Sequence, residues 1–132
     1  MGIQMAISTP WGISQTIRVL APGITHYTTA SHGGIKLSND RNAKVPEYLR
    51  RENGWYEEDC DWAVVAVIFP YAFSVEVGKN AYDTIRNWEP VGYTKLTGIV
   101  LRREDSFKLV NPYAKENKDS EWNAYKITFD ID

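Results

Sequence analysis

The sequence predicts an α+β fold, with one mainly antiparallel sheet and two to four helices packed mainly on one face of it. Three observations lead to this expectation. Turn signals at residues 9–12 and 21–23 separate short stretches with strand-forming composition. Residues 74–88 repeat apolar side chains at helical spacing. Residues 122–131 alternate between polar and apolar side chains, which is typical of a strand with one buried face.

The composition indicates a globular protein and argues against nucleic acids and membranes as general partners. A chain of 132 residues, 43% of them hydrophobic and 24% charged, suits one domain spanning residues 1–132. The net charge of −2 supplies no excess of basic residues for general nucleic-acid binding. One cysteine forms no internal disulfide, which fits a reducing compartment. We see neither a signal-peptide layout nor an apolar run of about 20 residues, so we expect a soluble cytoplasmic protein and no membrane partner.

The first 37 residues predict extended segments at residues 5–7, 13–20, 24–31 and 35–37. Thr9-Pro10-Trp11-Gly12 and Ala21-Pro22-Gly23 indicate turns, because Pro fixes φ and Gly tolerates positive φ. The segments on either side of the second turn should pair as an antiparallel hairpin. We expect His32-Gly33-Gly34 to break the strand that follows this turn.

Two short helices are expected next. Ser38 resembles an N-cap, since polar and acidic residues follow it directly. Pro46 disfavours helical geometry at Val45 but can open a second helix, which would run to about Glu52. Asn53-Gly54 would end that helix.

The stretch from Gly54 to Pro70, GWYEEDCDWAVVAVIFP, anchors the predicted core. It joins four acids in five positions to the longest apolar run of the chain. We favour a helix over residues 62–69, because Asp59 and Asp61 could cap its start and Pro70 would stop it. A buried strand is the alternative, because four β-branched residues occur in the five positions 64–68.

The last third predicts one clear helix and then strands. In residues 74–88 one face carries Val77, Ala81, Ile85 and Trp88, and Glu89-Pro90 should end the helix. Strands are expected at 96–102 and 107–110 around a charged turn at 103–106, with a polar loop at 111–120 and a terminal strand at 122–131.

Several motifs together resemble a known kind of domain. They are Thr9-Pro10-Trp11-Gly12, Ala21-Pro22-Gly23-Ile24, Ser31-His32-Gly33-Gly34, Leu37-Ser38 with Arg41-Asn42, and Gly54-Trp55-Tyr56-Glu57-Glu58-Asp59-Cys60. This array, which covers the chain up to about Pro90, resembles domains of unknown function of the DUF7007 type, seen in bacteriophage and mobile-element proteins. The resemblance implies a phage, prophage or plasmid setting. It implies no established reaction, so no functional residue is transferred from it.

Ser31-His32-Gly33-Gly34 is the sharpest local motif. A histidine followed by two glycines can expose its ring while the backbone approaches a ligand closely. A tight turn with a histidine that only forms hydrogen bonds is the alternative. The cluster Glu57-Glu58-Asp59-Cys60-Asp61 could hold a divalent cation, alone or with His32. Its alternative is a solvated helix start, with one acid paired to Arg41, Arg50 or Arg51.

No catalytic residue, metal-ligand set or cofactor is assigned from sequence, because the acids lack the spacing of an EF-hand loop or of His-Glu-x-x-His. Cys60 is expected to be a buried structural residue, since acidic neighbours raise a thiol pKa. His26 is expected to be structural or on the surface.

Three functions remain open, and an enzyme is not the favoured one. The first is a small phage or mobile-element accessory protein that binds a host macromolecule, such as a defence complex, in the host cytoplasm. The second is a nucleotide or small-molecule binding protein, and the third a small metal-dependent hydrolase or nuclease that uses His32. The candidate binding residues are Trp11, His32, Gly33, Gly34, Arg41, Trp55, Tyr56, Glu57, Glu58 and Asp59.

Overall fold

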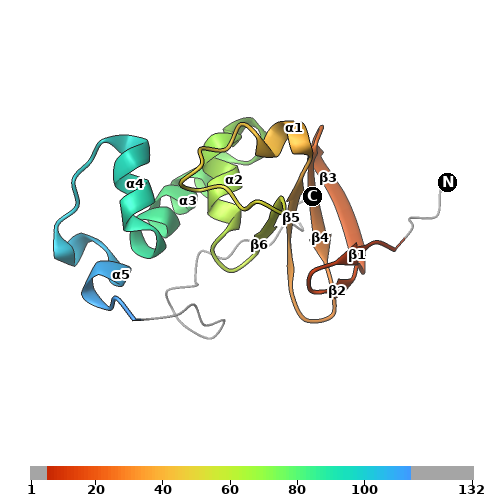
Figure 1. Cartoon of the computed structure of the whole chain (residues 1–132). Coiled ribbons are helices and arrows are strands. Elements are labelled where there is room, and N and C mark those ends of the chain that lie inside the picture. Colours follow the sequence, from red (N-terminus) through yellow and green to blue (C-terminus); the bar gives the residue numbers. More distant parts are fainter. Residues whose placement is uncertain (1–5, 114–132) are drawn as a thin grey trace.

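A computed structural model describes residues 6–113 and confirms the α+β class (Figure 1). Four strands pair antiparallel in the order β3-β4-β5-β6, and β1 and β2 form a separate small hairpin. The strands are β1 Ser8–Thr9, β2 Gly12–Ile13, β3 Thr16–Ala21, β4 Ile24–Thr28, β5 Gly33–Leu37 and β6 Trp55–Glu57. The helices are α1 Asn39–Asn42, α2 Trp62–Ile68, α3 Val75–Trp88, α4 Pro90–Thr97 and α5 Phe107–Val110, with short 3₁₀ turns η1 Pro70–Ala72 and η2 Arg103–Asp105.

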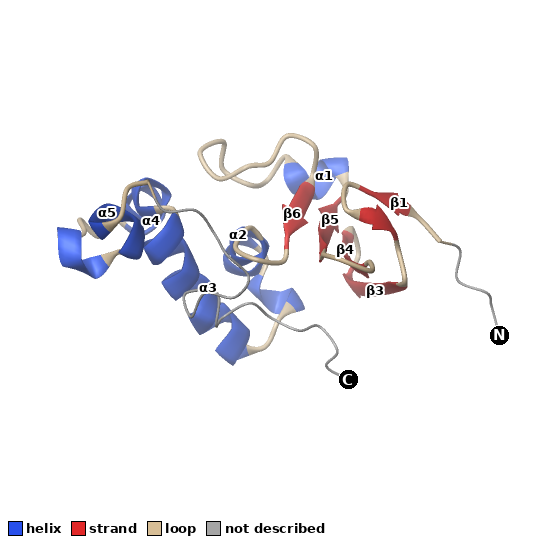
Figure 2. Ribbon diagram, turned by 90° about the horizontal axis from the view of Figure 1, so that it is seen from below, coloured by secondary structure: helices blue, strands red, loops and turns tan. Residues whose placement is uncertain are grey.

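Helix α2 lies against one face of the four-stranded sheet, and the β1–β2 hairpin lies on the other side (Figures 1 and 2). The inward face of the sheet contributes Ile24, Ile35, Leu37 and Tyr56 to the core. Helix α3 packs on the far side of α2 and adds Ala81 and Ile85. Residues 62–67 of α2 are all buried, so this helix is surrounded by protein rather than amphipathic.

The structure confirms that the apolar run is a helix and not a strand. Helix α2 ends before Phe69, where Pro70 begins a 3₁₀ turn. The predicted capping by Asp59 and Asp61 is wrong, because Asp61 occupies the N-cap position without a side-chain capping hydrogen bond. Its carboxylate instead accepts a hydrogen bond from Arg51 at 2.6 Å. The ion pair with Arg51 therefore forms in place of the capping hydrogen bond.

The N-terminal strands differ in detail from the prediction. The described chain has a strand at Ser8–Thr9 where 5–7 was expected, and the segment 13–20 is divided between β2 and β3. The turn at Gly23 is confirmed, with φ of +80°. The expectation that Gly33 and Gly34 break the strand is wrong, because both lie in β5 and pair with β4 and β6. Lack of a side chain here permits close packing rather than ending the sheet.

Between β5 and β6 the predicted Ser38 cap is confirmed, since its Oγ accepts a hydrogen bond from the Arg41 amide at 3.3 Å. The second predicted helix, from Pro46 to Glu52, is wrong, because residues 43–54 form consecutive turns. Strand β6 was not predicted at all. Three residues that include an acid give little strand signal, and their pairing with β5 defines the strand.

Helix α3 is confirmed, with Ser74 as its cap and Ala81, Ile85 and Trp88 on its buried face. The two strands predicted at 96–102 and 107–110 are wrong. Pro90 opens a further helix, α4, which ends at Gly98 in a left-handed conformation. Residues 107–110 form α5, in which Phe107 packs on Trp88 with ring centroids 5.1 Å apart. The predicted loop at 111–120 lies largely, and the strand at 122–131 entirely, outside the described residues.

Candidate functional site

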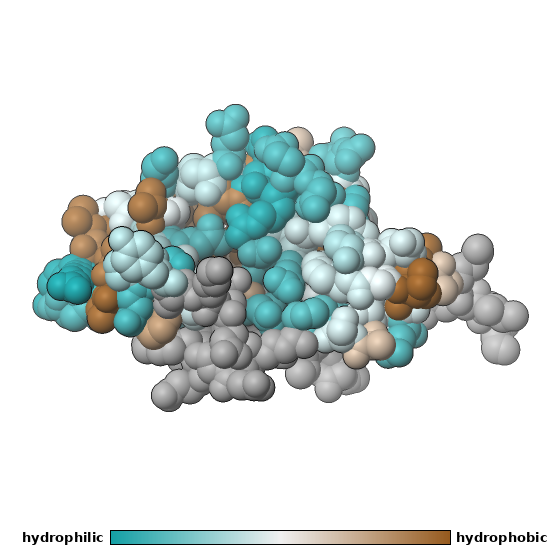
Figure 3. Space-filling model, turned by 60° about the horizontal axis from the view of Figure 1, so that its bottom comes forward, coloured by the Kyte–Doolittle hydropathy of each residue, from teal (hydrophilic) through white to brown (hydrophobic). Residues whose placement is uncertain are grey.

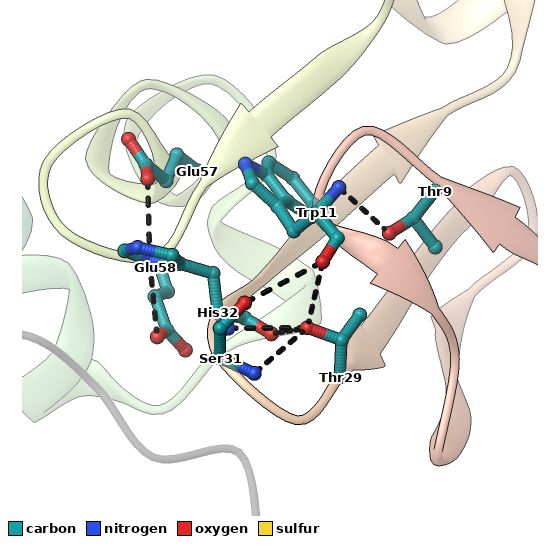
Figure 4. Close-up of polar contacts among 7 residues, drawn as sticks. All are labelled: Thr9, Trp11, Thr29, Ser31, His32, Glu57 and Glu58. Atoms are coloured by element: carbon teal, nitrogen blue, oxygen red, sulfur yellow. Dashed lines mark hydrogen bonds and ion pairs between the residues drawn. The ribbon is translucent and has the colours of Figure 1, made fainter.

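A tight turn after β4 positions His32. The Thr29 hydroxyl donates a hydrogen bond to the His32 carbonyl oxygen at 2.6 Å and accepts one from the His32 amide at 3.1 Å (Figure 4). The Thr29 amide also donates to that carbonyl at 2.8 Å. This closed turn directs the imidazole toward the segment that follows β6.

Antiparallel pairing of β5 with β6 brings the acidic cluster to His32. Gly34 lies opposite Glu57, and the Glu58 amide donates to the Gly33 carbonyl oxygen at 3.0 Å. His32 Nδ1 therefore lies 3.3 Å from a carboxylate oxygen of Glu57 and 4.0 Å from one of Glu58 (Figure 4). Residues that are 25 positions apart in sequence thus share one site.

Asp59 completes a group that could hold a metal ion. One donor atom each from His32, Glu58 and Asp59 lies within 4.8 Å of the others. Asp59 is 7% exposed, whereas the side chains of His32 and Glu58 are 28% and 18% exposed. Within the described part of the chain, Asp59 Oδ1 is a buried atom without a hydrogen-bond partner, and the buried His32 Nδ1 has the ion-pair contacts with Glu57 and Glu58 but no hydrogen bond. Buried polar atoms of this kind are costly unless something satisfies them.

Gly33 leaves the room that this cluster needs. A Cβ atom there would lie 2.7 Å from the Tyr27 carbonyl oxygen and 3.1 Å from Glu58 Oε1. Any larger residue would therefore displace β4 or the Glu58 carboxylate. The sequence analysis singled out this glycine because it would let a ligand approach the backbone. In the structure it is the carboxylate of Glu58 that approaches.

Aromatic side chains continue the site along the face of the sheet opposite α2. The Trp11 ring packs on Gly34, where a Cβ atom would overlap it. Trp11 meets Trp55 edge to face at 5.6 Å between ring centroids, and Tyr27 lies 5.3 Å from Trp55. The ammonium of Lys36 lies 5.7 Å from the centroid of the Trp55 ring. All four side chains are partly exposed.

Two predicted site residues lie elsewhere. Arg41 is beyond the other end of β5, where its Nε donates to the Pro22 carbonyl oxygen at 3.0 Å. Tyr56 points from β6 into the core and is fully buried. Its hydroxyl donates to Asn42 Oδ1 at 2.5 Å and accepts from the Arg51 amide at 3.0 Å. Alternation along β6 sends Trp55 and Glu57 to the site and Tyr56 away from it.

The remaining titratable candidates are structural. Cys60 is buried at 6% exposure. His26 is 6% exposed on the inward face of the sheet, and burial, with a contribution from the charge of Arg18, lowers its pKa to about 4. Neither lies in the group formed by His32, Glu58 and Asp59.

A second surface was not predicted from the sequence. It is an apolar groove of about 360 Å³ at the end of the molecule that carries α4 and α5. Figure 3 shows apolar side chains gathered at this end. Val91 and Val100 are 68% and 82% exposed there. Three of its residues, Val100, Leu101 and Leu109, fell in the segments predicted as strands, and no helix was predicted for the others. The lining is Pro90, Val91, Thr94, Lys95, Val100, Leu101 and Leu109.

Comparison with known proteins identifies the family of this chain but no individual related protein. Across residues 6–113, the helices are too short or too polar to cross a bilayer. No curated protein and no solved structure matches the chain. The family model described as a domain of unknown function, DUF7007, matches residues 4–119 and so extends well beyond Pro90. The chain therefore belongs to the DUF7007 family.

Proposed function

We propose that the protein is a divalent-cation-dependent hydrolase. The observation that supports this is the group of His32, Glu58 and Asp59, whose donor atoms lie within 4.8 Å of one another. Asp59 contributes a buried Oδ1 atom that has no hydrogen-bond partner in the described chain. A cation held by the group would satisfy this atom, and the two carboxylates would balance its charge.

The ligand set favours a catalytic cation over a structural one. One imidazole and two carboxylates suit Zn²⁺ or Mn²⁺. A cation held by His32, Glu58 and Asp59 would keep room for water among its ligands and would lower the pKa of that water. Glu57 contacts His32 at 3.3 Å and lies outside the group of three, so we assign it the role of general base.

An ion pair between protonated His32 and Glu57 would be the competing explanation of the same contacts. The two differ in their response to cations. Chelator-treated protein should be titrated with Mn²⁺ and Zn²⁺ by calorimetry, as wild type, Asp59→Asn and the control Asp83→Asn. Asp83 is a carboxylate of α3 that is paired with Arg86 at 2.8 Å.

We expect wild type and Asp83→Asn to bind the cation alike, and Asp59→Asn to bind it at least 10-fold more weakly. Hydrolysis should then be measured on phosphate mono- and diester probes. Activity that needs the cation and disappears in Asp59→Asn would support the hydrolase. Wild-type protein that binds neither cation would refute it.

A second candidate follows from the apolar groove. We propose that a host protein partner docks there, which agrees with the expectation of a phage or mobile-element accessory protein that acts in the host cytoplasm on a defence system. Exposed apolar patches mark protein interaction sites. Capture from host lysate should compare wild type with Val100→Asp and with Ile13→Asp, which changes an equally apolar, 61% exposed residue outside the groove. A partner retained by Ile13→Asp but lost by Val100→Asp would support this candidate, and equal capture would contradict it.

A further inference from the structure

We propose that the ligand of this site is a nucleoside phosphate, whose base stacks on one of the two perpendicular rings of Trp11 and Trp55 and meets the other at its edge, while its phosphate reaches the cation. The inference rests on the proposed function for its cation. It adds the class of substrate, which the group of His32, Glu58 and Asp59 does not define.

The aromatic side chains and the cluster are continuous on one face. Trp11 packs on Gly34, Gly34 pairs with Glu57, and Glu57 contacts His32. Figure 4 shows the Trp11 ring in the same view as the contacts of His32 with Glu57 and Glu58. A ligand that reached both features would therefore need a planar group next to an anionic group.

Trp11 is held by the same turn that holds His32. The Trp11 amide donates to Thr9 Oγ1 at 3.1 Å, while the hydroxyls of Thr29 and Ser31 approach the Trp11 carbonyl oxygen at 3.4 and 3.5 Å. Thr29 also closes the turn around His32. The backbones of Trp11 and His32 are thus held by one hydrogen-bonded unit, which favours a ligand that spans the two residues.

The chemistry of the surface fits a base better than an aliphatic group. Trp11, Tyr27 and Trp55 are partly exposed aromatic rings, and nucleobases stack on such rings irrespective of their sequence. Lys36 adds a positive charge beside Trp55. The acids near His32 repel phosphate while the site has no cation, so phosphate binding should follow cation binding.

The test compares a nucleotide with two ligands that lack either its base or its phosphate. With Mn²⁺ present, adenosine monophosphate, ribose 5-phosphate and adenosine should be titrated into wild type, Trp11→Leu, Trp55→Leu and Tyr71→Leu. Tyr71 is an aromatic residue outside the site, 63% exposed, and serves as the control. Circular dichroism and Mn²⁺ affinity establish that each variant is folded and still binds the cation.

We expect wild type and Tyr71→Leu to bind the nucleotide at least 10-fold more tightly than ribose 5-phosphate. This preference should vanish in Trp11→Leu or in Trp55→Leu, with Mn²⁺ affinity unchanged. A 5′-phosphorylated oligonucleotide distinguishes the two sources of the ligand: tighter binding than the mononucleotide indicates a strand end, and equal binding indicates a free nucleotide. If wild type binds ribose 5-phosphate and nucleotide equally, the inference is wrong although the proposed function stands. If Mn²⁺ itself does not bind, the proposed function fails first.

Discussion

Arg51 and Glu89, which are 38 positions apart, are joined by a hydrogen-bonded ion pair of 2.8 Å. The same guanidinium nitrogen contacts Asp61 at 2.6 Å. Arg51 therefore links the turns before β6 to the start of α2 and to the junction of α3 with α4. Burial opposes the charge of this guanidinium, but the hydrogen bonds and charges of Asp61 and Glu89 outweigh it and raise the pKa of Arg51.

Replacement of Arg51 by Ala should destabilise the fold, because Asp61 and Glu89 would be left without their shared cation. All three side chains are 25–30% exposed, so solvent screening keeps the expected loss of unfolding free energy at about 1–2 kcal/mol. Urea denaturation measures it. Arg103→Ala, at an exposed position of η2, is the control and should leave the midpoint unchanged. Equal midpoints for the two variants would show that the junction gains nothing from Arg51.

Replacement of Gly34 by Ala should disrupt the site. The added Cβ atom would lie 2.5 Å from the Tyr56 carbonyl oxygen and would overlap the Trp11 ring. Because a strand carbonyl cannot move aside, we expect a loss of several kcal/mol or a displaced Trp11, visible in its fluorescence. Gly78→Ala is the matched control, since nothing lies within 4 Å of its Cβ position in α3. That change should raise stability by roughly 0.5–1 kcal/mol through helix propensity. Similar effects of both substitutions would contradict the close packing of Trp11 and the Tyr56 carbonyl oxygen on Gly34.

Acid should destabilise the protein through His26. Burial, with a smaller contribution from Arg18, lowers its pKa from 6.5 to about 4, so the unfolded chain binds the proton more readily than the folded one. Stability from this group is fully present above pH 6.5 and falls as the pH drops toward 4. The loss should be about 2 kcal/mol by pH 5. Thermal unfolding from pH 7 to 4.5 measures it, and His26→Leu should flatten this part of the profile. An unaltered slope in that variant would assign the acid sensitivity to other groups.

Replacement of Tyr56 by Phe should reveal a purely structural role. The hydroxyl bridges Asn42 Oδ1 and the Arg51 amide, and its loss leaves both buried groups without this partner. The expected cost is about 1–3 kcal/mol. Burial raises the pKa of Tyr56, which agrees with a hydroxyl that stays protonated. Cation affinity should not change, because Tyr56 faces the core. Tyr71→Phe is the control for stability, and loss of cation binding in Tyr56→Phe would place this residue in the site after all.

The elements that carry their own signals could be predicted from sequence. Helix α3 has a Ser74 cap and one buried face, and the β3–β4 turn has Gly23 at positive φ. Strand β6 could not be predicted in this way, because its pairing with β5 defines it and that contact is not local. Helix α4 does carry local signals, Pro90 at its start and Gly98 after its end, and the prediction of a strand at 96–102 overlooked them.

The sequence identified some residues of the site but not that they lie together, because their proximity depends on strand pairing. His32, Gly33 and the acids stood out by residue type, but no spacing rule joins residue 32 to residues 58 and 59. The register that places Gly34 opposite Glu57 makes the connection. Tyr56 was grouped with the site because it is next to the acids in sequence, and Arg41 because its charge could pair with an acid. Strand alternation and the length of β5 carry their side chains elsewhere.

The order of the strands also determines when the site can form. Strands β3, β4 and β5 follow one another through short turns, so they can assemble from local contacts. Strand β6 arrives only after residues 38–54 have closed a loop, which makes its pairing the slower event. Until then β5 is an open edge, able to pair with another chain. A longer loop would therefore slow this pairing and keep the β5 edge open for longer, and Glu57 and Glu58 reach His32 only as this edge closes.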